Sequence, residues 1–321
     1  MTTSPSTLQA RPSLAGHIDI ARFDHWPKNV FVLPGVVAAL ALDPRADLAH
    51  VVVKTLVALL ATGLVASSNY TLNEVIDAPF DLHHPQKRTR PVPSGRVHIG
   101  LAYLQWLVLA AAGLAIGFRQ SAPMGVALLG LWIMGIVYNV RPVRTKDVPY
   151  LDVLTEAVNN PLRMLIGWYA VSALLVPPGT LVLSYWFVGC YFMAIKRLSE
   201  IRELGVSGEL QRYRKSVAWF SEPSMLVAIQ FYASAAMLFF GAFLMRYRLE
   251  MIVTFPLVAL VMAQYLHMAF LPHSAAQHPE KLYRQPRLMI SVVACVVAMA
   301  ILFFAPLPGI RELLAPTVPV R

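Results

Sequence analysis

The sequence predicts an all-α polytopic membrane protein, with nine transmembrane helices around a central cavity that opens to the cytoplasmic side. Of its 321 residues, 57% are hydrophobic and only 14% are charged, and the mean hydropathy is +0.58. Soluble domains carry about 25% charged residues. Several apolar stretches also approach the roughly 20 residues that a helix needs to cross a bilayer. The basic residues gather at the ends of these stretches, so an integral membrane protein is predicted.

The spans follow from the apolar stretches in chain order. We predict nine, at 29–45, 51–69, 99–117, 122–140, 151–174, 180–196, 224–244, 250–270 and 287–306. Residues 1–21 are polar and lack the apolar core of a signal peptide, so we expect a mobile N-terminal tail. A single transmembrane domain over 22–310 and a C-terminal tail over 311–321 complete the expected organisation. The two cysteines, Cys190 and Cys295, lie inside apolar stretches and indicate no disulfide framework.

The basic residues predict how the chain is oriented. Nineteen of the 27 Lys and Arg residues fall in the N-terminal segment or in the loops after spans two, four, six and eight, and seven fall on the opposite side. This bias predicts a cytoplasmic N-terminus and a C-terminus outside. Topology and anionic ligands also explain the net charge of +10 better than nucleic acid does.

An acidic motif ends the second span. Asn73, Asp77 and Asp81 recur every four residues, so on a helix they would share one stripe. Pro79 leaves a second possibility, a turn at Asp81 that curls back. A basic run follows: Lys87, Arg88 and Arg90. Hard oxygen ligands beside guanidinium groups suit Mg²⁺ together with a diphosphate, whereas the alternative is a solvated loop with scattered charge.

The fifth span carries a second acidic pair. Asp152 and Glu156 lie four residues apart, so their carboxylates share a helix face and repel one another unless a cation sits between them. Polar residues within a span usually mark a functional site. Three more polar residues lie nearby: Asn159, Asn160 and Arg163. We expect this pair to bind a metal, with a structural ion pair to Lys146 or Arg163 as the alternative.

Cations that could grip phosphate lie between and beyond these clusters. The predicted phosphate-binding residues are Tyr138, Arg141, Arg144, Lys146, Lys196 and Arg197. Complementing a helix dipole is the alternative role for the last two. Asp147 is either a ligand or a helix cap.

Two further groups of residues have weaker predicted roles. The neighbours of His83 and His84 are hard-ligand or phosphate-type residues, so no transition-metal site is expected there. The basic run from Arg212 to Lys215 is interpreted as a contact with the membrane surface or with phosphate.

Familiar nucleophile motifs are missing from the sequence. It contains no GxSxG elbow, no HExxH and no Walker A lysine. Catalysis would therefore rest on binding and electrostatic stabilisation, which suits a reaction in which diphosphate leaves an electrophilic carbon. We expect Mg²⁺ as the cofactor. Its predicted ligands are Asn73, Asp77, Asp81, Asp152 and Glu156, and the last four are also the predicted catalytic residues.

The acidic motif and its basic tail, NEVIDAPFD followed by KRTRP, resemble the first aspartate-rich motif of the UbiA superfamily of intramembrane prenyltransferases. The entry sequence HWPKNVFVLP and the segment YNVRPVRTKDVPYLDVLTEAVNNPLRMLIGW extend the resemblance, which covers roughly 22–306. The family commonly has Asp where this chain has Glu74 and Glu156.

Finer features are similar to the decaprenyl-phosphate phosphoribosyltransferase branch: WPKN before span one, Asp152 eleven residues before Arg163, and KRLSE closing span six. The resemblance implies transfer of 5-phosphoribose from phosphoribosyl diphosphate to a polyprenyl phosphate, with Mg²⁺ and diphosphate release, in the bacterial plasma (inner) membrane. It implies phosphate or substrate contacts at Asn73, Lys28, Lys87, Arg88, Arg141, Arg144, Lys146, Asn159, Arg163 and Lys196.

Two other functions stay open at this stage. One is a prenyltransferase that moves a polyprenyl group from its diphosphate to an aromatic or quinone-precursor acceptor. The other is a non-catalytic carrier or transporter of lipid phosphates, although no inverted repeat or pair of broken helices is evident. Under the enzyme readings the partners are the lipid bilayer, a membrane lipid substrate and a diphosphate-bearing donor, with no nucleic acid.

Overall fold

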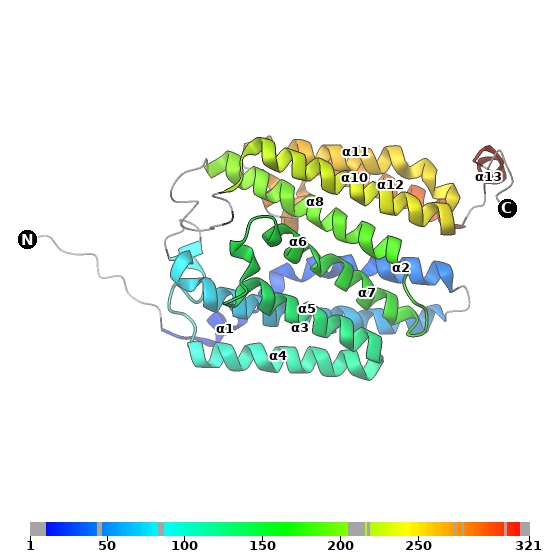
Figure 1. Cartoon of the computed structure of the whole chain (residues 1–321). Helices are drawn as coiled ribbons and strands as arrows, with labels where there is room; N and C mark the ends of the chain where they lie inside the picture. The colour runs from blue at the N-terminus through cyan, green and yellow to red at the C-terminus, as the bar shows by residue number, and fades with distance from the viewer. Residues whose placement is uncertain are drawn as a thin grey trace, which may run out of the picture. The chain divides into compact units, whose positions relative to one another are not determined.

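The computed structural model describes residues 11–43, 47–82, 87–204, 216, 219–272, 274–277, 279–304 and 307–314. All regular structure in these ranges is helical, which confirms the predicted all-α class (Figure 1). Two compact units form, Met1–Leu175 with Val206–Trp219 and Val176–Gly205 with Phe220–Arg321. The predicted domain and tail boundaries stay predictions. His83, His84 and the run from Arg212 to Lys215 lie outside the described residues.

The first unit is a helical bundle built around one long helix. Its elements are α1 (Leu14–Ile20), η1 (Phe23–Val32), α2 (Leu33–Leu42), α3 (Leu48–Asp81), η2 (Lys87–Thr89), α4 (Ile99–Gln120), α5 (Ala122–Asn139), η3 (Thr145–Asp147), α6 (Leu151–Ala157) and α7 (Asn159–Val171). Helix α3 packs against α4, α5 and α7, and α2 packs against α7. Their shared core is apolar and includes Ala58, Val65, Leu128, Leu131 and Ile166.

The second unit pairs α8 with α10 along their lengths (Figure 1). Its elements are α8 (Gly179–Leu204), α10 (Glu222–Tyr247), η5 (Leu249–Thr254), α11 (Phe255–Met268), η6 (Ala275–Gln277), η7 (Pro279–Arg284), α12 (Pro286–Phe304) and α13 (Pro308–Leu313). Buried hydroxyls bond to backbone carbonyls across it, from Ser184 to Ala236 at 3.0 Å and from Tyr191 to Met262 at 2.6 Å. Each hydroxyl therefore has an acceptor inside an apolar bundle.

Six helical segments of the described chain are long and apolar enough to cross a membrane: Leu48–Asp81, Ile99–Gln120, Ala122–Asn139, Gly179–Glu203, Glu222–Tyr247 and Leu249–Met268. A shorter apolar helix lies at Pro286–Leu302. Large apolar side chains such as Leu56, Leu104 and Ile290 stay exposed on these helices, as expected for surfaces that face lipid. The chain is an integral membrane protein. The count of nine spans stays a prediction.

Two predicted spans are interrupted in the structure. Span 29–45 is divided between η1 and α2, because Pro34 has no N–H for the carbonyl of Val30, which accepts instead from Leu33 in a tighter 3₁₀ turn. Span 151–174 breaks at Val158, between α6 and α7. Pro161 likewise cannot donate to the carbonyl of Ala157. A proline thus divides each of these two spans, although hydropathy alone predicts one continuous stretch for each.

Helices α2 and α7 cross at two glycines. A Cβ on Gly35 would lie 1.8 Å from the carbonyl oxygen of Met164, and a Cβ on Gly167 would lie 1.9 Å from that of Val32. No larger residue fits at this separation. As in other membrane helix pairs, small residues let the two backbones approach closely.

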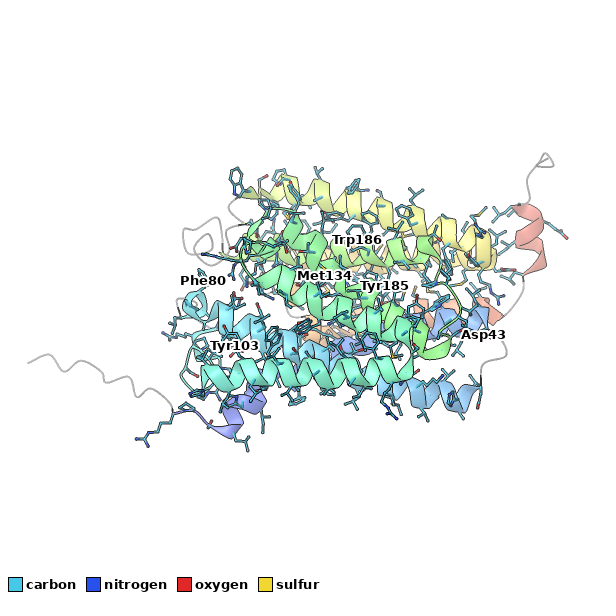
Figure 2. The ribbon with its side chains drawn as sticks, turned by 60° about the horizontal axis from the view of Figure 1, so that its bottom comes forward. Asp43, Phe80, Tyr103, Met134, Tyr185 and Trp186 are labelled. Atoms are coloured by element: carbon cyan, nitrogen blue, oxygen red, sulfur yellow. The ribbon has the colours of Figure 1, made fainter. Side chains whose placement is uncertain are left out.

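Phe80 and Asp43 mark opposite ends of the first unit in Figure 2. Phe80 lies in the last turn of α3, and Asp43 caps the end of α2. The acidic motif of α3 therefore lies at the end of the unit away from the α2–α3 connection.

Candidate functional site

The acidic motif lies on the last two turns of α3, which continues through Pro79 to Asp81 and is capped at Leu82. The alternative of a turn at Asp81 is therefore not formed. Each four-residue step rotates by about 40°, so Asp81 lies about 80° around the helix from Asn73. Seven residues return almost to the same stripe, which places Asp81 near Glu74. The motif thus presents two faces, Asn73 with Asp77 and Glu74 with Asp81.

The first face binds the ammonium of Lys146, which comes from η3 and is buried. Lys146 Nζ donates to Asp77 Oδ1, to Asn139 Oδ1 at 2.9 Å and to Asn73 Oδ1 at 3.4 Å. The three oxygens come from α3 and from the last residue of α5. A cation surrounded by side-chain oxygens is therefore a feature of the folded chain.

Arg144 adds a second cation at Asp77. Its guanidinium donates to Asp77 Oδ1 at 3.1 Å, to Asp147 Oδ2 at 3.0 Å and to the carbonyl of Asn139 at 2.9 Å. Its Cζ lies 5.3 Å from the centre of the Phe80 ring. The backbone of Arg144 has φ 25°, a sparsely populated conformation for a residue with a side chain. These contacts hold the residue there and tie the loop after α5 to α3.

The second face of α3 holds the loop that follows it. Glu74, which is buried, accepts a hydrogen bond from the backbone N–H of Val92 at 3.0 Å. Asp81 forms an ion pair with Arg90, with 2.7 Å between Nη1 and Oδ2. The basic run is therefore anchored beside the acidic motif at two points. One cation of that run, Arg90, is engaged by Asp81 itself.

The oxygen set fits a hard divalent cation. Carboxylate and amide oxygens are the ligands Mg²⁺ prefers, and Asn73, Asp77 and Asp81 supply them from consecutive turns. Asp81 is fully buried, and within the described residues its Oδ1 has no hydrogen-bond partner. Across those residues no three acidic, histidine or cysteine side chains converge. A centre that unites both acidic clusters stays a prediction.

The second acidic pair lies on the short helix α6. Asp152 is fully buried, and its Oδ2 accepts from the hydroxyl of Ser216 at 3.2 Å. Glu156 is half-buried one turn later and makes no hydrogen bond or ion pair within the described part of the chain. Arg163 on α7 donates to Asn29 Oδ1 and to the carbonyl of Asn159, both at 3.4 Å. Arg163 therefore links α7 to η1.

The remaining predicted residues are placed as follows. Arg88 and Arg141 are exposed, and Lys87 and Tyr138 are half-buried near the same end of α3 and α5. Lys196 and Arg197 lie in α8 of the second unit, two turns before its end, so they do not close a helix as expected. Arg197 is buried and paired with Glu200 at 2.7 Å. The roles of all these residues stay predictions.

Sequence reasoning did not identify Asn139 or the buried role of Glu74. Asn139 contributes both its side-chain oxygen and its carbonyl to the cations of the loop. The signal was its position at the end of an apolar stretch, directly before VRPVRTKD. Sequence reasoning also missed two residues near Lys28. Arg22, the N-cap of the 3₁₀ helix η1, lies six residues before Lys28, and His25 lies three residues before it.

The model of the UbiA prenyltransferase family matches residues 30–293. Decaprenyl-phosphate phosphoribosyltransferase of Mycobacterium tuberculosis is 28% identical over 234 residues, which are 71% of this chain and 73% of that protein. Lycopene elongase/hydratase of Haloarcula japonica is 31% identical over 145 residues, 43% of this chain and 47% of that protein. A solved UbiA homologue from Archaeoglobus fulgidus, bound to GPP and Mg²⁺, has a TM-score of 0.68 at 21% identity over 89% of this chain and 99% of that one.

Proposed function

Because the chain belongs to the UbiA prenyltransferase family, we propose that it transfers 5-phosphoribose from phosphoribosyl diphosphate to a polyprenyl phosphate in a Mg²⁺-dependent reaction. The observation that carries this proposal is the gathering of Lys146 and Arg144 on the hard oxygens of Asn73 and Asp77 at the end of a membrane helix. Similarity to decaprenyl-phosphate phosphoribosyltransferase over 71% of the chain supports the choice of donor and acceptor.

The reaction needs no general base. A phosphate oxygen of the lipid attacks C1 of the ribose, the bond from C1 to the diphosphate oxygen breaks, and diphosphate leaves with the bonding electron pair. An ionised phosphate carries no proton on the attacking oxygen, which agrees with the missing nucleophile–base motifs. The protein has to bind, orient and neutralise charge.

Charge neutralisation falls to the residues around Asp77. Mg²⁺ bound by Asn73, Asp77 and Asp81 would neutralise the departing diphosphate. Lys146 and Arg144 would donate to its oxygens, and Lys87, Arg88 and Arg141 would extend this contact toward the 5-phosphate. Asp152 and Glu156 would orient the sugar or a second metal. Tyr138 and Asn159 complete the proposed binding residues of the first unit. Lys196 and Arg197 of the second unit stay predicted phosphate contacts.

The second candidate function is prenyl transfer to an aromatic or quinone-precursor acceptor. Similarity to lycopene elongase/hydratase and to a homologue solved with GPP supports it, because both names point to isoprenoid substrates. The same cations would then bind a prenyl diphosphate, and the apolar helices would hold its chain. The number of phosphate groups distinguishes the candidates, since the phosphoribosyl reaction must accommodate phosphate on both substrates.

One paired assay separates these functions. Purified chain in detergent would receive Mg²⁺ with labelled phosphoribosyl diphosphate and decaprenyl phosphate, or with geranyl diphosphate and a hydroxybenzoate. We expect label in the lipid fraction only in the first mixture. Product only in the second would favour prenyl transfer. Product in neither, with Asp77→Asn indistinguishable from the unmodified chain in binding diphosphate, would contradict an enzymatic role.

We also propose the placement in the cell. The chain lies in the bacterial plasma membrane with its N-terminus in the cytoplasm, its C-terminus outside and the acidic motif on the cytoplasmic side. The excess of Lys and Arg on that side supports this orientation.

A further inference from the structure

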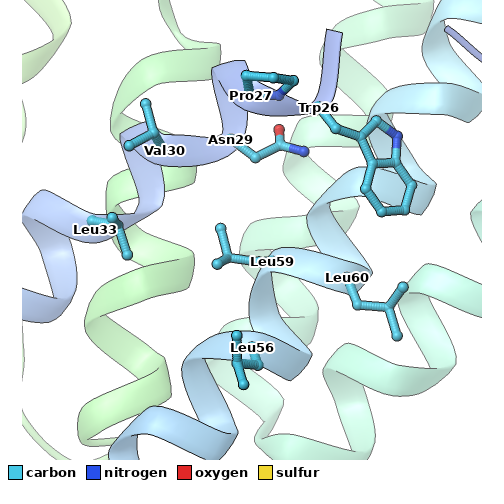
Figure 3. A pocket seen from close by; sticks show the side chains of 8 residues that line it. All are labelled: Trp26, Pro27, Asn29, Val30, Leu33, Leu56, Leu59 and Leu60. Carbon is cyan, nitrogen blue, oxygen red and sulfur yellow. The ribbon is translucent and has the colours of Figure 1, made fainter. Parts of the chain in front are cut away.

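An apolar groove runs along the first unit between η1 with α2 and the helix α3. Its volume is about 420 Å³, and six of its lining residues are Trp26, Val30, Leu33, Leu56, Leu59 and Leu60. Figure 3 shows the η1 side chains on one side and the α3 leucines on the other. Val30, Leu56 and Leu60 are all more than two-fifths exposed. On a membrane-spanning helix, an open groove of this composition suits a hydrocarbon chain.

A cationic cluster lies at the start of the same 3₁₀ helix. With three residues per turn, His25 and Lys28 fall on one face of η1, and Arg22 precedes the helix as its N-cap residue. Arg22 Nη2 lies 2.5 Å from His25 Nε2, and Lys28 Nζ lies 3.1 Å from His25 Nδ1. Tyr70 of α3 closes the cluster, with its ring centre 5.9 Å from Arg22 Cζ and 5.3 Å from the His25 ring. Two cationic groups thus share one imidazole.

The charge of this cluster favours an anion. The side chains of Arg22 and Lys28 are both cationic, and each lies within 3.1 Å of a ring nitrogen of His25. A phosphate, with several acceptor oxygens, could accept hydrogen bonds from both cations. Asp24, whose carboxylate lies 3.4 Å from His25 Nε2, adds one negative charge at the exposed rim. Arg22 adopts φ 53°, a left-handed conformation that costs energy for a residue other than glycine, as often found at binding sites.

Helix α3 sets the order of these features. Trp26 donates to the hydroxyl of Ser67 at 2.9 Å and packs on Gly63, so η1 lies along this stripe of α3. Tyr70 lies three helical turns beyond Leu59 on the same stripe, and Asp77 lies two turns beyond Tyr70, about 10 Å along the axis. Along α3 the groove comes first, then the cationic cluster, then the acidic motif.

From this order we infer that the groove and the cluster of Arg22, His25 and Lys28 form the docking site of the acceptor, a polyprenyl phosphate. The isoprenoid chain lies in the groove, the cations bind the phosphate, and the phosphate faces the donor held at Asp77. The inference rests on the proposed function for the identity of the acceptor. An isoprenoid without a phosphate would not bind the cations, and a soluble phosphate would not occupy the groove.

Photolabelling of the full chain tests the site without requiring turnover. A diazirine-bearing polyprenyl phosphate would be added to protein in phosphatidylcholine vesicles, and crosslinked peptides would be mapped by mass spectrometry. We expect labelling within residues 23–33 and 56–60, competed by decaprenyl phosphate and not by equal phosphatidylglycerol. Labelling elsewhere, or equal competition by phosphatidylglycerol, would overturn the inference.

Kinetics supply a second test. Arg22→Gln and Lys28→Gln should each raise KM for the lipid phosphate roughly tenfold, as expected for loss of a charge-assisted hydrogen bond. KM for phosphoribosyl diphosphate should stay unchanged. Leu59→Trp, which fills the groove, should act like them, whereas Arg119→Gln and Leu104→Trp on exposed positions of α4 should change neither constant. A rise in both KM values for Arg22→Gln would contradict a site for the acceptor. If no phosphoribose is transferred, the proposed function is wrong, and the photolabelling still tests whether the groove binds a polyprenyl phosphate.

Discussion

Lys146 and Asp77 form an ion pair in which an ammonium from the loop after α5 neutralises a carboxylate near the end of α3. Both side chains are largely buried, and the side-chain oxygens of Asn73 and Asn139 also accept from the ammonium. In the folded chain a cation is thus already held where a metal-bound diphosphate is proposed to lie. Asp77 and Lys146 are 69 residues apart in sequence, so the pair also connects α3 to η3.

The pair should show strong energetic coupling. Breaking a mostly buried pair leaves a charge without its partner. In a double-mutant cycle of Asp77→Asn and Lys146→Met we expect a coupling energy of about 1–3 kcal/mol. The measurement is unfolding of the purified chain in detergent. The control cycle is Asp19→Asn with Arg96→Met, an exposed pair at 2.7 Å, which should give less than about 1 kcal/mol. Equal coupling in both cycles would refute the prediction.

Diphosphate and Mg²⁺ should stabilise the chain together. Ligand that binds only the folded state at a hundred times its Kd adds about 2.7 kcal/mol, so the thermal midpoint should rise when both are present and fall back when EDTA is added. Asp77→Asn and Asp81→Asn should abolish the rise because each removes a proposed metal ligand. Asp19→Asn should retain it. A full rise for Asp81→Asn would exclude that residue as a ligand.

The anchor of the basic loop should depend on Glu74. Glu74→Leu removes the acceptor for the N–H of Val92, which costs about 1–3 kcal/mol for a buried donor left without a partner. Hydrogen exchange of peptides that cover residues 90–97 should therefore accelerate, while α4 is unaffected. Ser94→Ala is the control, because it removes two longer hydrogen bonds of the same loop, to the carbonyl of Pro91 and from Arg96 Nε, both at 3.2 Å. Unchanged exchange in Glu74→Leu would show that the Arg90–Asp81 pair alone holds the loop.

The glycine crossing of α2 and α7 should tolerate no side chain. Gly35→Ala and Gly167→Ala each place a methyl within 2 Å of a backbone oxygen, and we expect destabilisation of at least about 2 kcal/mol from overpacking. Gly179→Ala at the start of α8 has no atom within 4 Å of the added Cβ and serves as the control. Thermal midpoints in one detergent would test this, and a Gly35→Ala midpoint equal to that of Gly179→Ala would contradict the close approach.

The proposed orientation can be tested with thiol reagents, because both native cysteines are buried. Thr89→Cys lies in the basic loop and should react from the cytoplasmic side only, whereas Ala173→Cys, in the connection between α7 and α8, should react from outside. Both positions are exposed. A membrane-impermeant maleimide on intact cells and on inverted vesicles distinguishes the sides. The reverse pattern would invert the proposed topology.

The sequence predicted the helical class and the position of the acidic motif, because hydropathy and helical period are local properties. It predicted spans one and five as single stretches. The prolines that interrupt them, Pro34 in span one and the one in NNP in span five, were visible in the sequence. It could not predict which cation meets which carboxylate. Lys146 reaches Asp77 and Arg90 reaches Asp81 only because α3, the loop after it and the loop after α5 pack together. The rotation of about 80° around the helix axis from Asn73 to Asp81 then places the carboxylates of Asp77 and Asp81 on different faces of α3.

The length of α3 determines how deep the proposed chemistry lies. Its 34 residues extend about 51 Å, whereas the hydrocarbon core of a bilayer is about 30 Å thick. If Leu48 lies at one interface, roughly the last dozen residues project past the other one, even with an ordinary tilt. Asn73, Asp77 and Asp81 would then stand in the headgroup layer, and their charges would avoid the cost of insertion into hydrocarbon. A water-soluble donor would thus meet a lipid-borne acceptor without either one leaving its own phase.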